Sequence, residues 1–100
     1  MRKEKFHKVV LENKEYLKKL GIVSIGIFGS VVRNEDTKES DYDILVELEK
    51  DKKSFKSFTS LCDLFEERLG TNFELITKES LSPYIGPHIL KEVEYVQITS

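Results

Sequence analysis

The sequence is poor in cysteine, tryptophan and proline, and it contains no long hydrophobic run. Cys62 is the only cysteine among 100 residues, tryptophan is absent, and only two prolines are present. A single cysteine excludes an intrachain disulfide and a cysteine-based metal site. No stretch reaches the length of a membrane span, about eighteen apolar residues, and the charged start Met1–Lys5 lacks the apolar segment of a signal peptide. We therefore expect a cytoplasmic protein that does not enter a membrane.

A strong excess of charge is missing as well. Sixteen basic and eighteen acidic residues leave a formal net charge of −2. Domains whose main partner is nucleic acid usually present a net basic face, so direct nucleic-acid binding is not expected. Lysines crowd the N-terminal segment, and a local basic patch there is the alternative to a solvated helix face. A chain of 100 residues supports one core, so residues 1–100 are predicted to form a single domain.

Hydrophobic periodicity predicts the order helix, strand, strand, helix, strand, short helix, strand. The helical segments carry apolar residues at three-to-four spacing, whereas the strands are short runs that are β-branched or alternate apolar and polar positions. The predicted ranges are 4–20, 22–28, 42–49, 55–69, 72–77, a brief helix from about Pro83, and 93–98. This order is typical of an α/β (α+β) fold with a small mixed β-sheet of about four strands and helices packed on one face.

A Gly-Ser pair ends the first predicted strand. Gly29 has no side chain to hold a ligand away from the backbone. Ser30 offers a hydroxyl and a backbone N–H at the start of a turn, where phosphate oxygens are readily bound, and Arg33 lies close enough to add positive charge. A lone Gly-Ser pair carries little weight, because many strand-to-turn junctions contain one.

A carboxylate pair opens the next predicted strand. Asp41 and Asp43 alternate with an aromatic residue, so both side chains point the same way on a strand. Parallel carboxylates repel each other unless a cation lies between them, and Mg²⁺ binds one or two protein carboxylates together with phosphate oxygens. Phosphoryl-transfer sites with two metal ions about 3.5–4 Å apart usually need a third carboxylate. Glu74, an acid in an otherwise apolar predicted strand, is the best candidate.

Each carboxylate also has an ordinary interpretation. Asp-x-Asp at a strand start is more often a solvated strand end, and Glu74 alone fits the exposed face of an edge strand. The combination with the Gly-Ser pair favours a site instead. We predict catalytic and metal-binding roles for Asp41, Asp43 and Glu74, and nucleotide-binding roles for Gly29, Ser30 and Arg33.

These motifs together resemble the nucleotidyltransferase superfamily of polymerase β type, whose signature is Gly-Ser followed, across a spacer like this one, by Asp-x-Asp. More closely, the chain resembles the minimal nucleotidyltransferases (MNT proteins), the small antitoxin partners of HEPN-domain toxins. The resemblance runs from about His7 to Ile98. The matching stretches are IGIFGSVVR (25–33), SDYDILV (40–46), FELIT (73–77) and ILKEV (89–93).

The resemblance implies a palm-like nucleotidyltransferase sheet, Mg²⁺ in the form of two ions, and ATP as substrate. It also implies transfer of AMP to a tyrosine of a partner HEPN-type RNase toxin, which makes the chain an antitoxin. Gly29 and Ser30 would hold the outgoing phosphates, and Asp41 and Asp43 would bind the metal ions. Glu74 would assist one metal ion and receive the proton of the attacking hydroxyl.

Two positions depart from the family pattern, and two other functions stay open. Glu74 stands where Asp is more frequent, and Asn34 stands where Gly is frequent. The first alternative is a catalytically weak binding module that neutralises the toxin by contact. The second is nucleotide transfer to a small molecule or an RNA end, which the short chain disfavours because it has no second domain to hold such an acceptor. A homo- or hetero-oligomer is left open.

Other chemically capable residues are expected to serve packing or the surface. His7 and His88 have no second histidine at ligand spacing, and Cys62 belongs to an apolar helical stripe. The glycines do not form a dinucleotide fingerprint, and the absence of a G-K-[ST] triplet excludes a P-loop. Tyr84 and Tyr95 are kept as candidates for partner contacts.

Overall fold

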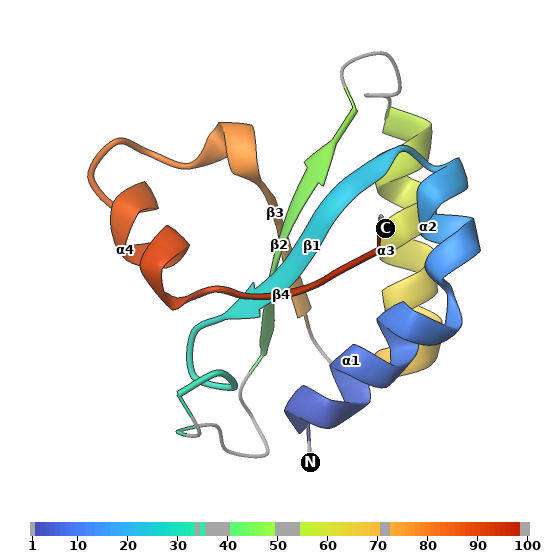
Figure 1. The fold of residues 1–100 in the computed structure, drawn as a ribbon, viewed down its shortest axis with the longest axis horizontal. Helices are drawn as coiled ribbons and strands as arrows, with labels where there is room; N and C mark the ends of the chain where they lie inside the picture. The colour runs from blue at the N-terminus through green and yellow to red at the C-terminus, as the bar shows by residue number, and fades with distance from the viewer. Residues whose placement is uncertain (1, 34, 36–40, 50–54, 71–72, 99–100) are drawn as a thin grey trace.

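The computed structural model describes residues 2–33, 35, 41–49, 55–70 and 73–98 (Figure 1). The predicted order of elements is confirmed, and so is the α/β class. Asn34 and most of the spacer before Asp41 lie outside the described residues. The elements are α1 (Arg2–Glu12), α2 (Lys14–Lys19), β1 (Ile22–Phe28), β2 (Tyr42–Leu48), α3 (Phe55–Leu69), β3 (Phe73–Thr77), the 3-10 turn η2 (Lys78–Ser80), α4 (Gly86–Glu92) and β4 (Glu94–Val96).

The first helix departs from its prediction. Instead of one helix over 4–20, α1 and α2 are separated at Asn13, whose φ of −113° and ψ of 21° leave the helical region. The Asn13 side-chain amide donates a hydrogen bond to the Val9 carbonyl at 2.8 Å, and the same carbonyl accepts the Asn13 N–H at 3.2 Å; side-chain bonds of this kind often bend a helix. The apolar periodicity runs across this break, so the pattern alone predicted one helix.

The C-terminal elements are shorter than predicted. The last helix begins at Gly86 rather than near Pro83, because a turn precedes it in which the Gly86 N–H donates to the Ser82 carbonyl at 2.8 Å. The last strand covers only Glu94–Val96 of the predicted 93–98. This strand is one edge of the sheet.

The sheet is mixed, with the strand order β3-β2-β1-β4. Strand β1 runs antiparallel to both β2 and β4, whereas β2 and β3 are parallel. The register pairs Phe28 with Asp43 and Asp43 with Glu74. Phe28, Asp43 and Glu74 therefore lie in one row of paired residues across β1, β2 and β3, and the two acidic residues are adjacent in this row.

Helices α1, α2 and α3 cover one face of the sheet, and α4 lies on the other side (Figure 1). The core between the helices and the sheet contains Phe6, whose ring stacks on Phe65 at a centroid distance of 5.9 Å and on Tyr42 at 6.4 Å. Ile44 and Val46 belong to the same core. Because side chains alternate along a strand, Asp43 projects from the opposite face, away from the helical layer.

In the part of the chain that the structure describes, no helix has both the length and the apolar character needed to cross a membrane.

Candidate active site

The turn after β1 is built around Gly29. This residue is buried and has a φ of 82°, in the left-handed region that favours glycine. A Cβ at Gly29 would lie 2.2 Å from Oδ2 of Asp43. The glycine predicted to permit a close approach of a ligand therefore permits the close approach of a carboxylate of the protein itself, which brings the turn and Asp43 together.

Ser30 follows in a compact turn. The Arg33 N–H donates to the Gly29 carbonyl at 3.1 Å, and the Glu35 N–H donates to the Ser30 carbonyl at 2.9 Å. The Val31 side chain is buried in the core and anchors the turn. The Ser30 side chain is half-buried in this turn.

The three predicted acids lie on the sheet face that the helical layer leaves open. Asp41 is exposed immediately before β2, Asp43 is half-buried, and Glu74 is exposed on β3 beside it. Burial raises the pKa of the Asp43 carboxyl above its ordinary value, and the charges of Glu74 and Asp41 raise this pKa further. The Arg33 charge lowers it, and Glu92 adds one more negative charge nearby. The site carries more negative than positive charge.

The donor set fits magnesium by its chemistry. Asp41, Asp43 and Glu74 supply hard carboxylate oxygens, which Mg²⁺ prefers, and a divalent cation would offset the repulsion that raises the Asp43 pKa. Across residues 2–33, 35, 41–49, 55–70 and 73–98, no three acidic, histidine or cysteine side chains already converge at metal-ligand spacing. Strand pairing places Asp43 beside Glu74, but the described carboxylates do not surround a common metal position.

The sequence patterns assigned no role to Glu92, although this residue lies in the matching stretch ILKEV (89–93). The Gly29 N–H donates to Oε2 of this residue at 3.0 Å, and the Arg33 guanidinium donates to Oε1. Arg33 Nε also lies 3.3 Å from a carboxylate oxygen of Glu35. Arg33, predicted to face phosphates, is thus partly engaged by two carboxylates of the chain. One weak signal was present, because Glu92 ends a helix, where the helix dipole disfavours an anion.

The ionisation of Glu92 follows from these contacts. Partial burial opposes the charged form, but the hydrogen bonds from Arg33 and Gly29 outweigh it. The pKa of Glu92 therefore lies below its ordinary value, and the residue is a carboxylate at neutral pH.

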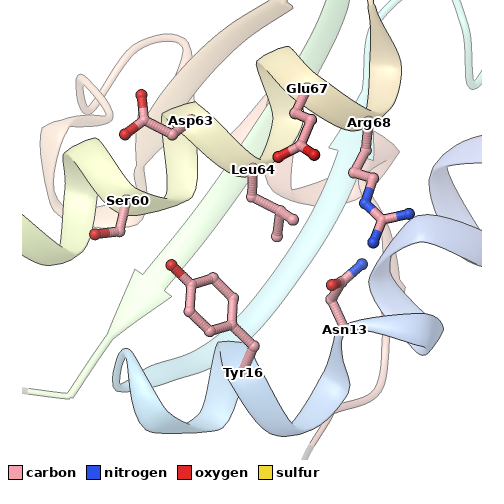
Figure 2. Close-up of a pocket in the computed structure, with 7 residues that line it drawn as sticks. All are labelled: Asn13, Tyr16, Ser60, Asp63, Leu64, Glu67 and Arg68. Carbon is pink, nitrogen blue, oxygen red and sulfur yellow. The ribbon is translucent and has the colours of Figure 1, made fainter.

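A separate hollow of about 460 Å³ lies on the helical side, between α2 and α3 (Figure 2). Its lining residues are Asn13, Tyr16, Ser60, Asp63, Leu64, Glu67 and Arg68. The helices cover the face opposite to Asp43, so the sheet separates this hollow from the carboxylates. It contains none of the predicted site residues.

The residues set aside in the sequence take part in packing or are exposed. The His7 ring packs edge-on against Phe6 at 6.1 Å. Cys62 is half-buried on α3, and burial raises the pKa of its thiol, which disfavours the reactive thiolate. Tyr84 is 85% exposed and Tyr95 is 45% exposed, so both rings are accessible.

The sequence profile of the nucleotidyltransferase domain family matches residues 8–96, from α1 to the end of β4. The chain belongs to the nucleotidyltransferase domain family. Two relatives support this membership over most of their length. A protein of Methanocaldococcus jannaschii named "Putative protein adenylyltransferase" is 39% identical over 92 residues, which are 90% of this chain and 87% of the relative. The protein adenylyltransferase MntA of Thermococcus cleftensis is 41% identical over 83 residues, which are 83% of each chain.

Solved structures agree with the fold of this nucleotidyltransferase. A structure described as a "putative minimal nucleotidyltransferase" superposes with a TM-score of 0.71 at 25% identity, over 88% of this chain and 93% of that chain. A toxin–antitoxin crystallised with AMP-PNP gives a TM-score of 0.69 at 19% identity. The match covers 100% of this chain and 76% of that chain. The complex of a tri-AMPylated Shewanella oneidensis HEPN toxin with MNT antitoxin gives a TM-score of 0.56 at 19% identity. This match covers 89% of this chain and 72% of that chain. The minimal nucleotidyltransferase fold expected from the motifs is confirmed, and the chain is an enzyme of this class.

Proposed function

We propose that the chain transfers AMP from Mg²⁺-ATP to a tyrosine of a partner HEPN-type RNase toxin, and that it acts in the cytoplasm as the antitoxin. The observation that carries the proposal is the contact between Gly29 and Asp43, because it joins the phosphate-binding turn to the carboxylates. The relatives named protein adenylyltransferases and the fold shared with an MNT antitoxin in complex with a HEPN toxin support the choice of acceptor.

The reaction is a displacement at the α-phosphorus of ATP. The tyrosine oxygen forms a bond to this phosphorus, the bond from the phosphorus to the bridging oxygen of the β-phosphate breaks, and pyrophosphate leaves. Glu74 takes the proton of the hydroxyl, since it is exposed at the edge strand where an acceptor can approach. Such transfers depend mainly on positioning and on charge stabilisation.

The other site residues hold the nucleotide. Ser30 and the N–H groups of its turn bind the outgoing phosphates, and Arg33 adds positive charge beside them. Asp41 and Asp43, with Glu74, would hold Mg²⁺. The metal ions would neutralise charge that develops on the phosphate oxygens. Residues 1–100 act as one domain, and the partner completes the site by supplying the acceptor.

Intact-mass spectrometry tests this proposal directly. The purified chain is incubated with Mg²⁺-ATP and a candidate HEPN-type toxin, and the expected product is a HEPN protein carrying AMP on tyrosine. The combined Asp41→Asn and Asp43→Asn variant should yield no adduct. Asp63→Asn is the matched control, because this exposed acid lies on α3 across the sheet and should leave transfer intact. Wild-type protein that forms no adduct, beside an active reference enzyme, contradicts the proposal.

A second candidate function is toxin neutralisation by contact alone. It is favoured by the Glu at position 74 and by the engagement of Arg33 with carboxylates of the chain itself. Cells that express the toxin distinguish the two functions. If the Asp41→Asn and Asp43→Asn variant protects these cells as well as the wild type does, contact is the mechanism and catalysis is not.

A further inference from the structure

We infer that Glu92 is a positioning residue, which holds the Gly29–Ser30 turn and the Arg33 side chain in place for the nucleotide. The inference rests on the proposed nucleotide transfer. It assigns a role to a residue that lies outside the Gly-Ser and Asp-x-Asp motifs.

Glu92 joins the two parts of the phosphate-binding turn. Its Oε2 accepts the Gly29 N–H at 3.0 Å, and its Oε1 accepts the Arg33 guanidinium. One carboxylate thus connects the start of the turn to the side chain that closes it. Hydrogen bonds to a charged carboxylate are stronger than those between neutral groups, so this connection restrains the backbone of the turn.

The chain after Glu92 is pressed against β1. Glu94 pairs with Ile27 in the sheet, and a Cβ at Gly26 would lie 2.8 Å from the Glu94 carbonyl oxygen and 2.8 Å from Cγ2 of Val93. This packing fixes the backbone at the end of α4 relative to the end of β1. The backbone that carries the Glu92 side chain is therefore held in a fixed position relative to β1.

The contact with Glu92 restricts the conformation of the Arg33 side chain. This side chain is long, and 47% of it is exposed, so without a partner it would sample many rotamers. The contacts to Glu92 and Glu35 occupy Nη1 and Nε, and the guanidinium carries further N–H donors that remain for phosphate oxygens. Glu92 therefore orders Arg33 before the nucleotide arrives and leaves donors for it.

In the opposing hypothesis, the Glu92 carboxylate occupies the position where a phosphate of ATP would bind, and it must move away when ATP binds. The two accounts predict effects of opposite sign. Removal of a positioning carboxylate weakens nucleotide binding, whereas removal of a competitor strengthens it. The backbone contacts at Gly26 favour positioning, because they hold Glu92 at the turn.

The test is the affinity of the full chain for Mg²⁺-ATP, measured by titration calorimetry. We expect Glu92→Ala to raise the Kd by about tenfold, the low end of the range for residues that orient a ligand-binding group. Glu92→Gln should also weaken binding, because an amide offers only one acceptor oxygen for two donors. Glu94→Gln is the matched control, since Glu94 pairs with Lys3 at 2.8 Å away from the turn and should leave the Kd unchanged.

Two further measurements separate positioning from a general loss of structure. In an Arg33→Ala background, Glu92→Ala should raise the Kd by only about threefold, because residues that act together are not additive. In the nucleotide-free protein, Glu92→Ala should shift the NMR resonance of the Gly29 amide and speed its hydrogen exchange, while the amides of α3 stay protected.

The outcomes are distinct. An unchanged or tighter Kd for Glu92→Ala, with wild-type protein that binds Mg²⁺-ATP, overturns the positioning role alone. Equal losses in the wild-type and Arg33→Ala backgrounds also overturn it. Wild-type protein that binds no Mg²⁺-ATP overturns the proposed function, and the inference with it.

Discussion

Replacement of Gly29 by alanine tests the close approach between the turn and the carboxylates. Two effects add in this variant. A residue other than glycine in the left-handed region costs about 1–2 kcal/mol, and this applies at a φ of 82°. The new Cβ would lie 2.2 Å from Oδ2 of Asp43, and relief of such overpacking costs about 1–3 kcal/mol more. The expected loss is therefore about 2–5 kcal/mol in the free energy of unfolding, against a total of roughly 5–15 kcal/mol for a domain.

Urea unfolding measures this loss, provided that the slope against denaturant stays unchanged. Gly70→Ala is the matched control, because Gly70 has a φ of 61° but an added Cβ there meets nothing within 4 Å. It should show only the backbone cost of about 1–2 kcal/mol. The difference between the two variants isolates the contact with Asp43. Equal losses would refute the close approach as the reason for glycine at position 29.

A double-mutant cycle assigns the contact to its partner. Asp43→Ala removes the oxygen that the new Cβ meets, so Gly29→Ala should cost about 1–3 kcal/mol less in that background. In the otherwise wild-type chain, Gly29→Ala should also displace the Asp43 carboxylate, and a displacement of about 1 Å lowers transfer by roughly a hundredfold. An additive cycle would show that the alanine clashes elsewhere.

Three further predictions concern charge, metal and core. The folded-state pKa of Asp43 is raised by burial and by neighbouring carboxylates, so its ionised form destabilises the metal-free fold. Asp43→Asn should therefore stabilise the chain at pH 7, and urea titrations should show this gain disappear at acidic pH, where the wild-type carboxyl is protonated in both the folded and the unfolded state. Chelation of Mg²⁺ should abolish AMP transfer in the mass assay and its return should restore it; transfer that persists in EDTA contradicts the metal role. Phe65→Ala should cost about 3–5 kcal/mol in urea unfolding, because the ring is fully buried against Phe6.

The sequence contains the local part of the site. Gly29 and Ser30 end a short apolar run, and Asp43 alternates with core residues, so strand periodicity alone places them at a strand end and on the open face. The position of Glu74 beside Asp43 follows once β2 and β3 are paired in parallel register. The pattern predicted the strands and their faces, but the register is a property of the assembled sheet.

The parts that the sequence did not reveal depend on distant contacts or on single side chains. Glu92 meets Gly29 across 63 residues of chain, and no local pattern encodes that contact. The break at Asn13 lies inside a continuous apolar stripe, so the hydrophobic periodicity does not reveal it. Strand β4 is short because only three of its residues pair with β1, and this pairing is a long-range contact.

The alternation along β2 divides the work of the strand between two sets of positions. Tyr42, Ile44 and Val46 belong to the core, whereas Asp43 belongs to the site. A substitution scan along β2 should therefore show loss of folding at one set and loss of transfer without loss of folding at Asp43. A deletion of one residue from this strand would exchange the two sets, placing a carboxylate in the core and an aliphatic chain at the nucleotide. A change in the length of β2 should therefore disturb the core and the site together, whereas a substitution should disturb only one of them.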